Sequence, residues 1–105
     1  MPMKDKQQDH FMMREFCRVE ILNSIMCRLR GAYVVCAVME KTLLTQDQEK
    51  IKRYCDRAGE ITKVLHSIFW KSSKEQEEAI TLFGEELKKM IKEATLRSEK
   101  LREKN

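Results

Sequence analysis

The stretch RLRGAYVVCAVMEK, residues 28–41, sets the number of helices that the sequence predicts. Arg28 and Arg30 suit the last turn of a helix, where basic side chains complement the dipole, and Gly31 suits the position just after it. The pattern therefore predicts one helix that ends at Arg30 and a second helix over residues 32–41. Valine is also common in strands, but no other segment offers a strand to pair with this one, so a helix is favoured.

Upstream of Gly31, apolar residues recur at steps of three and four, the spacing of one helix face. They are Met12, Phe16, Val19, Leu22, Met26 and Leu29. Ile21 and Ile25 widen this stripe, so the first helix either buries a broad face or bends midway. Residues 1–10 are polar and are predicted to be frayed. In the second helix, one apolar face is predicted from Val34, Val35, Val38 and Met39.

Downstream, two capping boxes predict helix starts. Thr45 and Gln48 have the capping-box spacing and open a third helix, which turns its apolar residues Ile51, Tyr54 and Cys55 inward. Gly59 marks the following turn. The fourth helix has the cleanest pattern, with Ile61, Val64, Leu65, Ile68 and Phe69 at i, i+3, i+4, i+7 and i+8.

The second box, Ser73–Gln76, opens a fifth helix. Beyond Ala94 the chain is mostly polar, which indicates a solvated helix that is either continuous with the fifth or a broken sixth. The sequence also leaves open that the C-terminal helix serves a structural function as part of a coiled coil.

Composition limits the class of protein. The chain has 105 residues, 42% of them apolar, with 3 Gly and 1 Pro, which favours one helical domain over residues 11–105 and excludes a many-stranded sandwich. The longest apolar run, residues 32–39, is far shorter than the roughly 20 residues of a membrane span. The start has no apolar stretch of signal-peptide type. A cytoplasmic protein without a membrane contact is expected.

Catalytic and metal chemistry has little support in the sequence, so no enzyme, cofactor or metal site is predicted. The four cysteines, Cys17, Cys27, Cys36 and Cys55, form no CxxC pair. They are read as small buried hydrophobes, while a disulfide framework would require a secreted context. His10 and His66 are the only histidines. A Cys55–His66 nucleophile is conceivable, but a core cysteine and a partly exposed histidine are favoured.

A small basic nucleic-acid-binding module is the alternative function. Lys and Arg total 21 against 17 Asp and Glu, a net charge of +4. The basic residues concentrate only near Arg28 and Arg30 and over residues 50–53, and elsewhere the two signs alternate, which favours a solvated surface over a polyanion site. Trp70 is read as a core-edge residue rather than a base-stacking platform. Met12, Met13, Met26 and Met39 are read as core filler.

Three segments resemble caspase recruitment domains, which belong to the death-fold superfamily. Residues 34–45, VVCAVMEKTLLT, are similar to the family's second helix and the turn after it. Residues 64–71, VLHSIFWK, resemble its fourth helix, and residues 79–87, AITLFGEEL, its fifth. The resemblance covers about residues 11–100. Ser72 departs from it, because the family usually has glycine there, and the loop after it is about three residues longer than usual.

This resemblance implies an all-α, six-helix antiparallel bundle of death-fold (Greek-key) type. It further implies homotypic binding, to another such domain or to itself as a filament, in apoptotic or inflammasome signalling, with no small-molecule substrate. Matching positions give a basic surface of Arg14, Arg18, Arg57 and Lys63, and an acidic surface of Glu40, Asp47, Glu49 and Asp56. Head-to-tail docking of unlike patches does not close on itself and can propagate.

Overall fold

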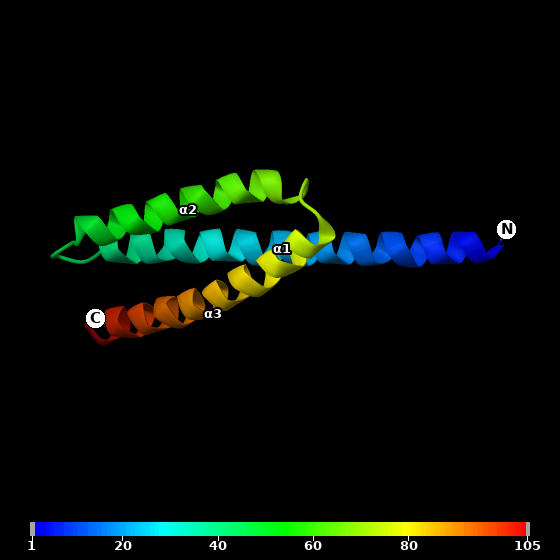
Figure 1. Ribbon diagram of the computed structural model, residues 1–105. Helices are drawn as coiled ribbons and strands as arrows, with labels where there is room; N and C mark the ends of the chain where they lie inside the picture. Colours follow the sequence, from blue (N-terminus) through cyan, green and yellow to red (C-terminus); the bar gives the residue numbers. More distant parts are fainter. Residues whose placement is uncertain (1, 105) are drawn as a thin grey trace.

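The computed structural model describes the backbone of residues 2–104 and the side-chain surroundings of residues 12–102. This part of the chain forms three helices, α1 (Pro2–Lys41), α2 (Gln48–Ile68) and α3 (Ser73–Lys104). Figure 1 shows α2 running back along α1, and α3 returning in the direction of α1. Residues 1–10, predicted to be frayed, lie at the start of α1, except Met1, which lies outside the described residues.

The six-helix death-fold prediction is wrong. Gly31 and Gly59, expected at helix breaks, lie inside α1 and α2, and no glycine of the described chain has a positive φ. A glycine within a helix costs about 1 kcal/mol relative to alanine. That is too little to end a helix that packs against neighbours on both sides of the glycine. The predicted first and second helices are therefore one helix, as are the predicted third and fourth.

The helix caps lie close to the predicted boxes but use other residues. Asp47, not Thr45, caps α2, and its side chain accepts hydrogen bonds from the backbone N–H groups of Glu49 and Lys50. Ser72 caps α3, because its Oγ accepts from the N–H of Glu75 at 3.2 Å. An oxygen at the cap satisfies N–H groups that have no partner within the helix.

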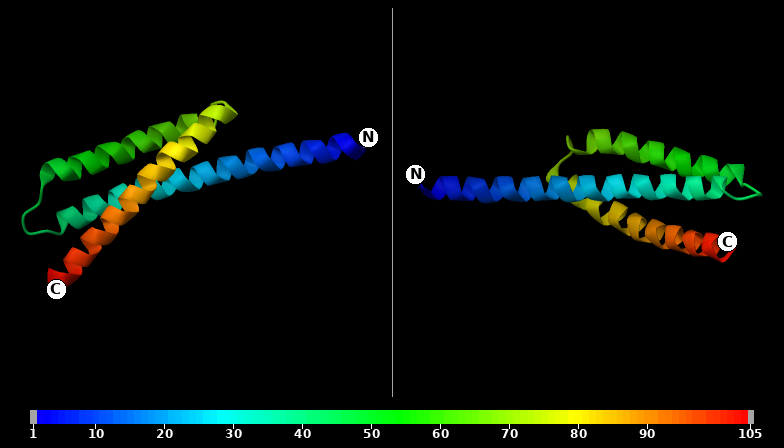
Figure 2. Two further views of the ribbon diagram at one scale, coloured as in Figure 1. Left: turned by 60° about the horizontal axis from the view of Figure 1, so that its bottom comes forward. Right: turned by 180° about the vertical axis from the view of Figure 1, so that it is seen from behind.

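The core lies along the C-terminal two thirds of α1, where α2 and α3 both pack against it (Figure 1). Leu22, Met26, Leu29 and Cys36 of α1 are fully buried, together with Ile61 of α2. The N-terminal part of α1 extends beyond both partners, as Figure 2 also shows. The molecule measures 68 × 25 × 15 Å, and its radius of gyration of 18.3 Å exceeds the roughly 13 Å of a compact domain of this length.

The continuity of α1 decides which side of residues 32–41 is buried. Cys36 follows Leu29 by two helical turns, so Cys36, with Ala37 and Glu40, faces α2 and α3 and is buried. Val34, Val35 and Val38, expected to form the inward face, are instead about half exposed. They lie on the opposite side of α1 because the buried direction is carried through Gly31 without a break.

Replacing Gly59 with Ala is expected to raise the free energy of unfolding by about 0.5–1 kcal/mol, because alanine loses less backbone entropy in a helix. A Cβ at Gly59 would meet no atom within 4 Å. Urea denaturation of Gly59→Ala, with Gly84→Ala in α3 as the matched variant, measures this gain. A loss of stability at Gly59 would contradict the continuous helix and restore the predicted turn.

Candidate interaction surface

A buried ion pair ties the end of α1 to α3. Arg97 Nη1 donates to Glu40 Oε2 at 2.6 Å, and the Glu40 side chain is 5% exposed. The other carboxylate oxygen of Glu40 accepts from the backbone N–H of Asp47, the residue that caps α2. Arg97 also donates to Glu93 and to the hydroxyl of Tyr54. All three helices therefore meet at one polar network, whose buried carboxylate has two hydrogen-bond donors.

A second network joins the middle of the bundle. Arg57 of α2 donates through Nη2 to Glu86 Oε1 at 2.6 Å and through Nε to Oε2 at 2.9 Å, a two-point contact. Tyr33 of α1 donates its hydroxyl to the same carboxylate at 2.5 Å. Across the described side chains, no buried polar atom lacks a hydrogen-bond partner. The interior thus offers no unsatisfied group for a ligand.

These contacts shift several pKa values. The hydrogen bond from Arg97, followed by that from the Asp47 N–H, lowers the pKa of Glu40, and the hydrogen bond from Arg57 lowers that of Glu86. Burial, followed by hydrogen bonds to Glu86 and Glu93, raises the pKa of Tyr33 and of Tyr54 to about 12. The carboxyls are held in their charged form and the phenols in their neutral form.

The stability of the bundle should therefore fall at both ends of the pH scale. In the folded state, the pKa values of Glu40 and Glu86 lie below their ordinary 4.5. Both carboxylates therefore stabilise the fold at pH values above 4.5, and this stability is lost as the pH falls through the lowered pKa values. Tyr33 and Tyr54 contribute fully below pH 10.0, and their contribution is lost as pH rises toward 12. Urea denaturation across pH measures both limbs. If the Glu40→Gln, Glu86→Gln double variant lost as much stability at acid pH as the wild-type chain, the acid limb would not come from these two carboxyls.

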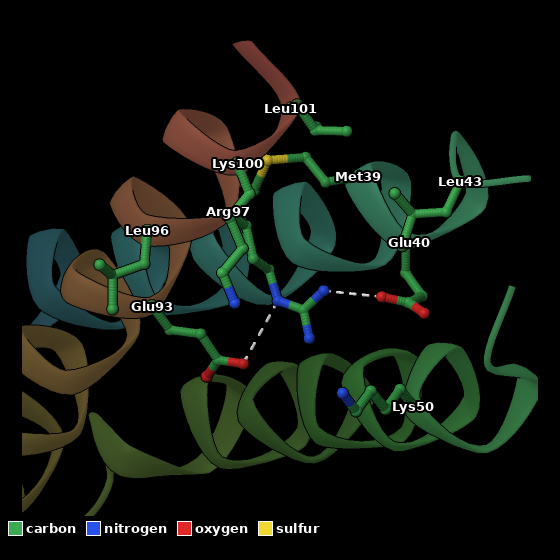
Figure 3. A pocket seen from close by; sticks show the side chains of 9 residues that line it. All are labelled: Met39, Glu40, Leu43, Lys50, Glu93, Leu96, Arg97, Lys100 and Leu101. Carbon is green, nitrogen blue, oxygen red and sulfur yellow. Dashed lines mark hydrogen bonds and ion pairs between the residues drawn. The ribbon is translucent and has the colours of Figure 1, made fainter. Parts of the chain in front are cut away.

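A pocket of about 350 Å³ opens where α1 ends and α3 passes the start of α2 (Figure 3). Arg97 forms its floor, bound to Glu40 and Glu93 as the dashed lines show. Apolar side chains, Leu43, Leu96 and Leu101 among them, line the walls, with Lys50 at one edge. Because the guanidinium is already neutralised by two carboxylates, this pocket is best explained as the open end of the bundle.

The structure spreads the residues of the predicted basic surface over two helices. Arg14 and Lys63 are exposed. Arg18 is drawn into the contact between α1 and α3, where it donates to Gln76, Ser73 and Glu15. Arg57 takes part in the second network, bound to Glu86 and Glu60. Two of the four basic groups therefore have internal partners.

The predicted acidic surface is divided in the same way. Glu40 is buried with Arg97, and Asp47 caps α2. Glu49 and Asp56 are exposed on α2. The resemblance implied a surface position for Glu40, but α1 continues through Gly31, so Glu40 lies on the same buried side of the helix as Leu29.

Among the described residues, the side of α1 turned away from α2 and α3 forms one long unpartnered surface. We call it the outer face of α1 and define it by ten residues: Met13, Phe16, Cys17, Glu20, Ser24, Cys27, Gly31, Val34, Val35 and Val38. All are exposed except Cys27, which is intermediate. Phe16 is 59% exposed and Val38 53%. Near Met13 and Cys17 this face borders a shallow groove of about 530 Å³ at the start of α3.

The periodicity of the outer face is that of a helix–helix seam. Its residues are spaced by three and four, the heptad spacing at which one helix packs along another. Predicting this surface from the sequence was possible in principle. The stripe of small and apolar residues continues through Gly31, and its polar interruption is confined to Glu20 and Ser24.

No protein-family model, curated protein or solved structure matches the chain. The resemblance to caspase recruitment domains is thus left as a prediction about three short segments, without the bundle that it implied.

The same helix is long and apolar enough to cross a membrane, over Met12–Lys41, by length and composition alone. Core helices of soluble proteins pass the same test. Arg28 and Arg30 lie near the middle of this segment, and charged side chains there cost several kcal/mol in hydrocarbon. Insertion would also strip α2 and α3 from the buried side of α1.

The residues considered for catalysis do not form a site among the described side chains. Cys55 and His66 are both exposed on α2, eleven positions apart, and no hydrogen bond joins them. Cys36 is the one buried cysteine. Side-chain groups of the kind that hold a metal do not cluster in the described part of the chain. His10 lies outside the residues whose side chains are described.

Proposed function

We propose that this chain is a protein-interaction module that associates with a second copy of itself through the outer face of α1. One observation carries the proposal: Phe16, Val34, Val35 and Val38 remain about half exposed along one side of α1. Large exposed apolar patches mark interaction sites on soluble proteins. Homotypic association is also what the resemblance leads one to expect.

The mixed charge of the chain supports a protein partner over a nucleic acid. Arg57 and Arg97, two potential phosphate ligands, are bound to carboxylates within the bundle. The outer face itself carries Glu20 at the centre of its N-terminal half. An acidic residue within an apolar seam favours a partner that brings a basic group, which the same helix provides in Arg28 and Arg30.

Sedimentation equilibrium over a range of concentrations tests the proposal. The wild-type chain is expected to rise reversibly from the mass of a monomer to that of a dimer. Val35→Glu should abolish this rise with an unchanged melting temperature, because Val35 is half exposed and contributes little to the core. Leu82→Glu is the matched control, since Leu82 is 70% exposed on α3, away from the outer face.

Two results would overturn the proposal. One is a monomer at every concentration, including a monomer that sediments with lipid vesicles, which would assign the outer face to a membrane. The other is a dimer that persists in Val35→Glu at wild-type strength, which would place the interface elsewhere.

A further inference from the structure

We infer that two copies of α1 pair antiparallel about a two-fold axis between Ser24 and Cys27, with Glu20 of each copy opposite Gly31 of the other. This inference rests on the proposed function and specifies its geometry. It follows from how the exposed residues of the outer face can be matched with themselves.

The antiparallel register matches every apolar residue of the outer face with an apolar or small residue. When the positions of two facing residues add up to 51, Met13 faces Val38, Phe16 faces Val35, and Cys17 faces Val34. Nearer the axis, Ser24 faces Cys27. A shift by one heptad either way ruins the match. In one direction Val38 lies opposite the polar start of α1, and in the other it lies opposite Glu20.

Charge selects the same arrangement. In a parallel pair, Glu20 would face Glu20 in the seam, and like charges across a helix pair repel. In the antiparallel register Glu20 faces Gly31, and Arg28 and Arg30 of the second copy lie within one turn of it. No ion pair among the described side chains uses Glu20, Arg28 or Arg30. These charges are thus available for the second copy.

The geometry of α1 permits close approach. A Cβ built at Gly31 meets no atom within 4 Å, so the space opposite Glu20 is open. The spacing of three and four residues suits the shallow crossing at which two helices pack along their length. Most of α2 and α3 lies on the other side of α1 (Figures 1 and 2), and only the start of α3 borders the outer face, at the groove beside Met13 and Cys17.

The extent of the seam sets its strength. From Met13 to Val38 it spans about 38 Å at 1.5 Å per residue, and with a helix about 10 Å wide it covers roughly 400 Å² per copy. Two copies cover roughly 800 Å², less than the 1,200–2,000 Å² of a stable specific interface. The dimer is therefore reversible, and it forms only at the higher concentrations of the size measurement.

Thiol cross-linking tests the register. In a background of Cys27→Ser and Cys55→Ser, only Cys17 is open to reagents, because Cys36 is buried. Adding Val34→Cys places a thiol opposite Cys17 of the second copy. Within one chain these two positions are 17 residues, about 26 Å, apart along the helix, too far for a short bismaleimide. A covalent dimer thus reports on the contact between copies.

The expected result is a covalent dimer only when both thiols are present. Paired thiols have an effective concentration near millimolar, so at tens of micromolar protein cross-linking should be roughly tenfold or more faster than in either single-thiol chain. The two controls are the background chain, which keeps Cys17, and the same chain with Val34→Cys and Cys17→Ser. Circular dichroism confirms that each chain keeps its helices.

The other outcomes separate the register from the proposed function. Cross-linking of either single-thiol chain would indicate a parallel pair and overturn the inference. An absence of cross-links in a chain that sediments as a dimer would overturn the register but leave the self-association intact. If the chain neither forms cross-links nor sediments as a dimer, both the register and the proposed self-association are wrong.

Mixing charge variants gives a second readout of the same register. Glu20→Lys alone, and Arg28→Glu with Arg30→Glu, should each weaken self-association several-fold through like charges across the seam. A mixture of the two chains is expected to form the mixed dimer in preference to either homodimer, because both of its charge contacts are then complementary. Equal populations of mixed and unmixed dimers would contradict the placement of Glu20.

Discussion

Replacing Arg97 with Met is expected to lower the free energy of unfolding by about 3 kcal/mol, the lower end of the cost of stranding one member of a buried ion pair. The lower end applies because the Arg97 side chain is 18% exposed. The substitution leaves the Glu40 carboxylate buried with one remaining donor, the Asp47 N–H. It also removes the hydrogen bond to Tyr54 and the contact of the guanidinium with its ring.

Two further variants isolate the cause of this loss. Lys88→Met breaks an exposed ion pair with Glu85 and is expected to cost less than about 0.5 kcal/mol. Glu40→Leu combined with Arg97→Met removes both charges and should recover most of the loss, since an apolar pair can replace a buried ion pair. Urea denaturation at neutral pH compares the three chains. Equal costs for Arg97→Met and Lys88→Met would show that the buried network adds no stability.

Replacing Leu29 with Ala is expected to lower the free energy of unfolding by about 3 kcal/mol, within the range for a buried leucine that leaves a cavity. Leu29 is fully buried on α1, the helix that both α2 and α3 cover. In the six-helix interpretation the same residue would lie in the last turn of a helix, beside a loop. A large loss therefore reports that α2 and α3 close over Leu29.

The control for this prediction is Leu44→Ala, in the loop between α1 and α2. Leu44 is fully exposed, so the same deletion of atoms should change the stability by less than about 0.5 kcal/mol. Thermal and urea unfolding of both variants provide the comparison. Similar effects at the two positions would indicate that α2 and α3 do not close over Leu29.

Much of the core was predictable from periodicity. Leu22, Met26 and Leu29 were expected in one stripe, as were Ile61, Leu65 and Ile68 in another, and all six are buried. Spacing alone defines these stripes, because both lie in the part of the bundle where α1 is packed against its partner helices. The caps were predicted to within two residues at α2 and one residue at α3, because oxygen-bearing side chains cluster at both starts.

The extrapolation of the first stripe toward the N-terminus did not hold. Met12 and Phe16 continue the spacing of Leu22, yet they are 64% and 59% exposed. Two causes act here: α1 has 40 residues and α2 has 21, so the start of α1 extends past α2, and Phe16 lies on the outer face of α1. Spacing identifies a helix face but does not reveal where the covering helix ends.

The sequence by itself determined that the chain is helical, which residues form the apolar stripes, and, through the two capping boxes, where α2 and α3 begin. Only the tertiary structure decided that Gly31 and Gly59 continue their helices, because packing on both sides outweighs a glycine cost of about 1 kcal/mol. Because α1 continues through Gly31, Cys36 and Glu40 lie on the same buried side of the helix as Leu29. Glu40 thereby becomes an internal carboxylate held by Arg97, and Val34, Val35 and Val38 turn outward into the surface that we propose for self-association.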